Sequence, residues 1–209
     1  MAKGYSKRKT NIRKEETTFL IVCEGQKTER IYFNRYRERN NGLLIFTPNS
    51  SVTDPENLVS FALSQINKYD IDFDNGDQVW CVFDADQNTN ENIEKAKKLT
   101  NNKVKLCLSN PCFELWYLLH FCYYDQRITT EDLQSKLETH IRYYDKVKDY
   151  FDELLSKRDA AIRQANKLNQ KFLTAGLELL STQSNPSTQV VHLVQEMLQI
   201  ITENKEKTK

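Results

Sequence analysis

Strand and helix patterns alternate in the first half of the chain. Short apolar runs rich in β-forming residues are separated by stretches in which apolar residues recur at helical spacing. The predicted strands cover residues 17–23, 43–47, 79–83 and 104–108, and the predicted helices cover residues 28–39, 55–69 and 90–100. This order predicts an α/β fold in which a mainly parallel sheet is flanked by helices on both faces.

The second half of the chain has a helical pattern throughout. An aromatic-rich segment at 113–124 is followed by amphipathic stretches at 131–139, 143–152 and 158–180 and by a last helix at 188–201. We therefore divide the chain into a flexible basic arm at 1–16, an α/β core at 17–124 and a helical C-terminal extension at 125–209 that packs on the core.

Composition limits the class of protein. The 209 residues are 39% hydrophobic and include 5 Gly and 4 Pro, which suits one compact domain and excludes a Pro/Gly-rich disordered chain. Net charge is only +1, but the first fourteen residues hold six cations and no acid: Lys3, Lys7, Arg8, Lys9, Arg13 and Lys14. The five cysteines favour buried, reduced thiols. No apolar run could span a membrane, so we expect a soluble, cytoplasmic protein.

Three carboxylates follow predicted strands. Glu24 comes directly after the first strand, and Asp84 and Asp86 come after the third. Because ligands of open parallel sheets bind beyond the carboxyl ends of the strands, we expect these side chains to lie close together. Close carboxylates repel each other unless a cation or protons compensate, and oxygen ligands of this kind suit Mg²⁺ or Mn²⁺. The alternative is that all three only form turns or cap helices.

Two Asn-Pro pairs predict further helix starts near the same edge. Asn110 follows the fourth strand, and Ser187 and Thr188 follow the second pair. Capping is the simpler interpretation, and a phosphate contact with the free N–H groups of the helix start is the alternative. Glu114 would lie in a first helical turn, where it either takes part in catalysis or offsets the helix dipole.

The helix after Glu24 is rich in basic residues. Lys27, Arg30 and Arg35 are our candidates for contact with a nucleic-acid backbone, whose affinity rests largely on phosphate neutralisation. A solvated helix face, on which such charges pair with Glu29 and Glu38, explains them equally well.

Four motifs together resemble the RloB-like family of bacterial defence proteins. They are Cys23-Glu24-Gly25, Phe83-Asp84-Ala85-Asp86, Ser109-Asn110-Pro111-Cys112-Phe113-Glu114-Leu115-Trp116 and Asn185-Pro186-Ser187-Thr188. The third motif is the specific one, and the resemblance spans about residues 19–198. More broadly, the first two motifs, with Thr28 and Glu29, are similar to the Toprim fold of topoisomerases, primases and OLD-type nucleases.

The resemblance implies a Toprim-type, metal-dependent endonuclease that acts on nucleic acid, with tRNA or other RNA favoured over DNA. On that pattern Glu24 is a general acid/base or a metal ligand, and Asp84 and Asp86 hold Mg²⁺ or Mn²⁺. It further implies the effector of a phage-defence system controlled by an ABC-type or AAA-type ATPase partner, with no membrane involved. Gln26 stands where relatives often carry an acid, and the oligomeric state is left open.

Two other functions fit parts of the same sequence. A catalytically silent Toprim scaffold would bind its ATPase partner or nucleic acid without cutting. A haloacid dehalogenase-like phosphatase would use the strand that ends in Asp84 and Asp86, but that pattern wants Thr or Val where Asn88 stands and normally opens the chain.

Overall fold

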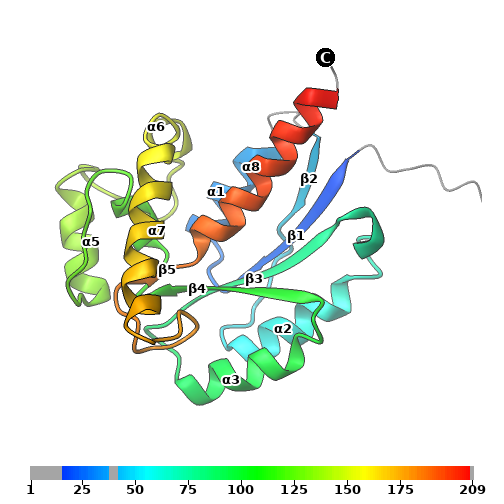
Figure 1. Cartoon of the computed structure of the whole chain (residues 1–209), viewed down its shortest axis with the longest axis horizontal. Coiled ribbons are helices and arrows are strands. Elements are labelled where there is room, and N and C mark those ends of the chain that lie inside the picture. The colour runs from blue at the N-terminus through cyan, green and yellow to red at the C-terminus, as the bar shows by residue number, and fades with distance from the viewer. Residues whose placement is uncertain (1–15, 38–41, 208–209) are drawn as a thin grey trace, which may run out of the picture.

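The sheet is the centre of the molecule. The computed structural model describes residues 16–37 and 42–207, so nearly all of the predicted basic arm lies outside the described residues. Five strands pair in the order β2-β1-β3-β4-β5 (Figure 1). They are β1 (Thr17–Cys23), β2 (Leu43–Phe46), β3 (Gln78–Asp84), β4 (Val104–Asn110) and β5 (Ser187–Thr188). The first four are parallel and β5 is antiparallel to β4, which confirms the predicted α/β fold.

Helices cover both faces of this sheet (Figure 1). On one face lie α2 (Pro55–Gln65) and α3 (Asn90–Leu99), and on the other lie α1 (Thr28–Arg37) and α8 (Val190–Lys207). A further group gathers beside the β5 edge: α5 (Thr130–Glu138), α6 (Phe151–Leu155) and α7 (Arg158–Thr174). The short α4 (Glu114–Leu118) follows β4, and a 3₁₀ turn, η1 (Phe73–Asn75), precedes β3.

The first strand is buried on both faces. Phe19 and Ile21 pack with residues of α1 and α8, whereas Leu20 and Val22 pack with residues of α2 and α3. Each of these four side chains has no exposed surface. A strand between two helical layers needs apolar residues at every position, which explains why its sequence does not alternate.

Helix starts follow the expected chemistry on the α2 and α3 side. Asp54 caps α2, because its carboxylate accepts from the N–H groups of Glu56 and Asn57 and a proline occupies the first turn. Thr89 caps α3 by accepting from Asn92 N. Side-chain oxygens therefore satisfy free N–H groups at the starts of both α2 and α3.

The prediction of a helix at 143–152 is wrong. This segment consists of turns and irregular chain, and helix begins only at Phe151. Tyr143 has a φ of 59°, in the left-handed region, which a helix does not allow. The helix predicted at 158–180 is too long, because α7 stops at Thr174 and Gly176 follows with a φ of 75°.

The two Asn-Pro pairs do not begin helices as predicted. Asn110 is the last residue of β4, and the next helix begins at Glu114 without a side-chain cap. Ser187 and Thr188 form β5, and α8 begins at Val190. Thr188 still accepts from Val190 N at 3.3 Å, so it satisfies a helix N–H from within a strand. Both Asn-Pro peptide bonds are cis.

Four of the five cysteines are buried, as predicted. All five are free, and the fifth, Cys122, is half-buried. Burial is the main cause that raises the pKa of the Cys23 and Cys107 thiols, which keeps them protonated. Across the described residues, no helix is both long and apolar enough to cross a lipid bilayer.

Candidate active site at the carboxyl edge of β1 and β3

Glu24 and Asp84 meet where the chain reverses its direction across the sheet. From β1 the chain passes to β2 on one side, and it later returns to β3 on the other side. Ligands of open α/β sheets bind at such a switch point, beyond the carboxyl ends of the two strands. Glu24 follows β1 and Asp84 ends β3, and Glu24 Oε2 accepts from Asp84 N at 3.1 Å. The fold therefore joins two of the predicted site residues directly.

Asp84 has a buried carboxylate oxygen without a partner. Its Oδ1 is inaccessible to water and makes no hydrogen bond within the described residues. Burial raises the pKa of Asp84 well above its usual range, and repulsion by Glu29, Glu114, Glu24 and Asp86 raises it further. A carboxylate held this way binds a proton or a cation more readily than one at the surface.

Glu24 is half-buried beside it, and burial raises the pKa of Glu24 to about 7. The hydrogen bond from Asp84 N opposes this shift, and the charges of Asp86 and Glu29 add to it. A carboxyl group with a pKa near neutrality exists in both protonation states at working pH. Glu24 is therefore suited to give or take a proton.

Glu29 is buried, which contradicts the alternative in which it pairs with basic residues on a solvated helix face. It lies in the first turn of α1 with 5% of its surface exposed, and burial raises its pKa. A Cβ on Gly25 would lie 2.2 Å from both carboxylate oxygens of Glu29. Glycine at position 25 therefore leaves room for the Glu29 carboxylate in its present position.

Glu114 is almost fully buried and has two partners from a distant part of the chain. Its Oε1 accepts from Tyr144 OH at 3.0 Å and lies 3.1 Å from Lys146 Nζ. Thr28 Oγ1 donates to the carbonyl of Lys146 at 3.2 Å and thereby fixes the lysine backbone to α1. Burial opposes the charge of Lys146, but Glu114 outweighs it and the pKa of Lys146 is raised. Lys146 thus brings a cation to the carboxylate cluster.

Asp86 lies in the turn after β3 and makes its side-chain contact with the start of α5 rather than with Asp84 or Glu24. It is exposed, and its Oδ2 accepts from Thr130 Oγ1 at 2.9 Å, at the start of α5. The chain turns after β3 because the N–H groups of Ala85 and Asp86 donate to the carbonyl of Pro111. The predicted trio therefore consists of a joined pair and a third carboxylate at its rim.

The carboxylates are of the kind that binds divalent cations, but they are not arranged as a set of metal ligands. Within residues 16–37 and 42–207, no three Asp, Glu, His or Cys side chains are already placed as a set of metal ligands. The unpartnered Asp84 Oδ1 and the mutual repulsion around it nevertheless fit a cation bound by oxygen. Ligation would require the side chains of Glu24 and Asp86 to rearrange around Asp84.

The three candidates for nucleic-acid contact differ in how far other residues already engage their charges. Lys27 is exposed, whereas Arg30 donates to the carbonyl of Thr47 at 3.2 Å and contacts Asn49. Arg35 pairs with Asp149 and, at 2.8 Å, with Asp152. Asp149 lies in the segment that carries Lys146 and Asp152 lies in α6, so Arg35 ties α1 to both. Its charge is already compensated.

The chain is a member of the RloB-like family. The family model described as RloB-like protein matches residues 19–197, which include every carboxylate of the site. The comparisons with curated proteins and with solved structures give no match.

Proposed function

We propose that this protein is a metal-dependent nuclease of the Toprim type. The observation that carries the proposal is the buried, unpartnered Oδ1 of Asp84, which lies at the switch point among carboxylates that raise its pKa. Such a concentration of negative charge destabilises a folded protein unless a ligand compensates it. A function that requires a cation accounts for this cost.

Glu24, Asp84 and Asp86 would hold Mg²⁺ or Mn²⁺. A divalent ion there would polarise a phosphoryl oxygen and lower the pKa of its bound water. If Glu24 does not itself ligate the ion, its pKa of about 7 suits it to exchange a proton with the attacking water or the leaving group. Lys146 pairs with the Glu114 carboxylate and would add positive charge near a phosphate bound at this edge.

RNA, and tRNA in particular, is the proposed substrate class, and the proposed setting is phage defence under the control of an ATPase partner. Membership of the RloB-like family supports this setting. A freely active nuclease would harm the cell that makes it, which favours control by a partner.

The test is cleavage by the full chain, alone and together with any ATPase whose gene lies next to its own. Labelled tRNA, single-stranded DNA and a phosphomonoester are incubated with Mg²⁺, Mn²⁺ or EDTA. We expect tRNA cleavage that requires metal and falls at least about 100-fold in Asp84→Asn, because a neutral amide binds a divalent cation much more weakly than a carboxylate does. Asp74→Asn, an exposed change in η1, is the matched control and should keep full activity.

Other outcomes separate the alternatives. Equal cleavage by wild type and Asp84→Asn, or cleavage in EDTA, would contradict the proposal. Binding of tRNA or the ATPase without any cleavage would favour a silent scaffold, and hydrolysis of the phosphomonoester alone would favour a phosphatase.

A further inference from the structure

A polar cavity lies beside the carboxylate pair, on the β4 side of the sheet. It has a volume of about 550 Å³, within the range of sites for small organic groups. Its walls come from the turn after β3, the start of α3, the end of β4, the segment before α5 and the loop between α7 and β5. Asp86 lines the cavity and also acts electrostatically on Glu24 and Asp84, so the cavity and the candidate site are neighbours.

Amides are the largest group of side chains that line this cavity: Gln87, Asn88, Asn90, Asn110 and Asn185. Each amide offers both a donor and an acceptor, which matches the edges of a nucleobase. The charged lining residues are Asp86, Glu131 and Arg127, and two carboxylates against one guanidinium disfavour a phosphate as the main ligand. The apolar side chains of Pro111 and Ile128 add surface against which a flat ring could pack.

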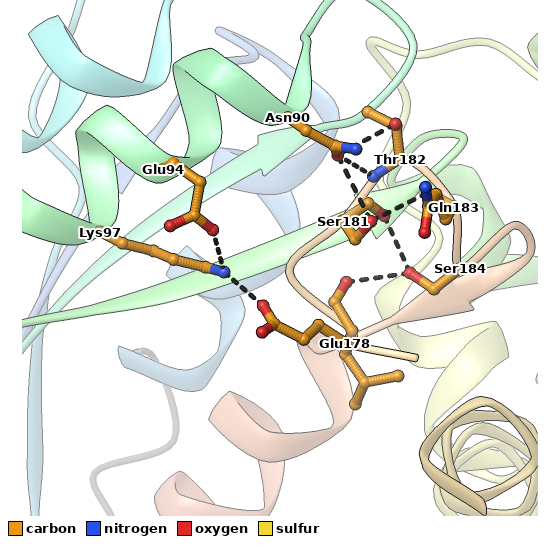
Figure 2. A network of polar contacts seen from close by, with 9 residues as sticks. Asn90, Glu94, Lys97, Glu178, Ser181, Thr182, Gln183 and Ser184 are labelled. Atoms are coloured by element: carbon orange, nitrogen blue, oxygen red, sulfur yellow. Dashed lines mark hydrogen bonds and ion pairs between the residues drawn. The ribbon is translucent and has the colours of Figure 1, made fainter. Parts of the chain in front are cut away.

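The wall of the cavity is fixed before any ligand arrives. Asn90 Oδ1 accepts from Thr182 N at 2.8 Å and from the hydroxyls of Thr182 and Ser181, so the loop is tied to the start of α3 (Figure 2). Lys97 holds the same loop through Glu178 at 2.6 Å (Figure 2). A wall held by so many contacts loses little freedom on binding, which favours affinity.

Several polar groups of the lining residues have no hydrogen-bond partner among the described residues. Asn110 is 3% exposed, and its Nδ2 donates to the carbonyl of Ser181, but its Oδ1 has no partner among the described residues. Asn88 Nδ2 donates to the carbonyl of Asp84 at 2.6 Å. The Oδ1 of Asn88 likewise has no partner among the described residues. The exposed Arg127 makes no ion pair or hydrogen bond within residues 16–37 and 42–207. These amide oxygens and the guanidinium are therefore available to hydrogen-bond a ligand.

We propose that this cavity binds the base of one unpaired nucleotide and thereby gives the enzyme a base preference next to the bond that it cuts. The inference rests on the proposed nuclease function. A base can enter this pocket only when it is unstacked and unpaired, which favours loops and single strands over duplex. Asn110 and Asn88 would accept from the amino or imino group of the base, and Arg127 would donate to it.

The test measures binding separately from cleavage. Labelled RNA hexamers of A, of C and of U are titrated in EDTA against the full chain, and fluorescence anisotropy reports affinity. We expect about a tenfold difference between the tightest and the weakest hexamer, the size that one good base contact provides. Arg127→Ala should reduce this difference to less than about threefold. Arg163→Ala, an exposed arginine on α7 outside the cavity, should keep it.

Each remaining outcome overturns a defined part of the inference. If Arg127→Ala weakens all three hexamers equally, Arg127 contacts phosphate and the cavity does not read bases. If wild type binds the hexamers equally, or binds none of them, the subsite does not exist even where metal-dependent cleavage of tRNA is observed. If the base preference holds but no substrate is cleaved with any metal, the subsite stands and the nuclease function fails.

Discussion

At the scale of single residues, the site is a group of carboxylates that the fold brings together at a cost. Glu24, Asp84 and Glu29 all have raised pKa values, and burial is the largest cause in each case. A raised pKa means that the ionised form is less stable in the folded protein than in the unfolded chain. The site should therefore reduce stability at neutral and alkaline pH when no cation is bound.

Glu24→Gln should make metal-free protein more stable at pH 8. The pKa of Glu24 is about 7 when folded and 4.5 without perturbation, so the folded state holds more protons between these values. The free energy of unfolding should fall as pH rises through this window and then level off. Because Glu24 is partly exposed and screened, we expect Glu24→Gln to gain only about 1–2 kcal/mol at pH 8 and nothing near pH 4.

Urea denaturation in EDTA at several pH values measures this difference. Glu138→Gln, an exposed change on α5, is the control and should follow the wild-type curve. Mg²⁺ should stabilise wild type more than Glu24→Gln. Parallel curves for wild type and Glu24→Gln would show that Glu24 ionises as freely in the folded state as in the unfolded chain.

Sequence could predict Glu24 and Asp84 because strand ends have a fixed place in a parallel sheet. It could not predict Glu29, because helical spacing does not reveal which way a charged residue near a helix end turns. Gly25 was a signal for it, since a glycine beside a helix start often marks a close approach. Lys146 had no local signal, because its contact with Glu114 spans 32 residues and depends on tertiary structure.

At the scale of elements, the irregular segment at 142–149 completes the site. It was predicted to be helical, but three contacts fold it back onto the sheet edge: Tyr144 and Lys146 to Glu114, and Asp149 to Arg35. The charged residues of this segment favoured an amphipathic helix, and long-range pairing overrode that preference. The strands and the helices on the α2 and α3 side were predicted within a few residues, because there local pattern and tertiary burial agree.

Lys146→Met should destabilise the protein and impair cleavage, whereas Lys148→Met should do neither. Removing Lys146 leaves the buried Glu114 with Tyr144 but without a nearby cation. Since about half of the Lys146 side chain is exposed and its ion pair is screened, we expect a loss of about 1 kcal/mol. Lys148 is exposed and lies in the same segment, so it controls for loss of charge.

Chemical denaturation measures the stability of each variant, and tRNA cleavage measures its activity. Lys146→Arg should recover part of the lost stability, because the charge returns with a different shape. Equal stability and activity of Lys146→Met and Lys148→Met would mean that the contact with Glu114 is too weak to matter.

At the scale of the whole molecule, one apolar core joins the sheet to the C-terminal helices. Trp80 and Ile21 from the strands belong to the same buried cluster as Leu168 from α7 and Val194 from α8. The second Asn-Pro segment supplies β5, which pairs with β4 and extends the sheet. A two-residue strand has no periodicity of its own, so the sequence pattern could not separate it from the helical region.

A chain that ends at residue 124 should therefore fail to fold. Truncation there removes β5, α7 and α8, and α8 alone supplies five fully buried side chains: Val190, Val191, Leu193, Val194 and Met197. At roughly 1.5–3 kcal/mol for each such side chain, the loss from α8 approaches the whole stability of a typical domain, about 5–15 kcal/mol. The full chain should unfold in one transition, with far-UV and near-UV circular dichroism changing together. Removing only residues 205–209 is the control and should shift the midpoint little, because Lys205 and Glu206 are exposed. A cooperative transition in the chain that ends at residue 124 would show instead that the sheet and its first helices form an independent unit on which the helical region only rests.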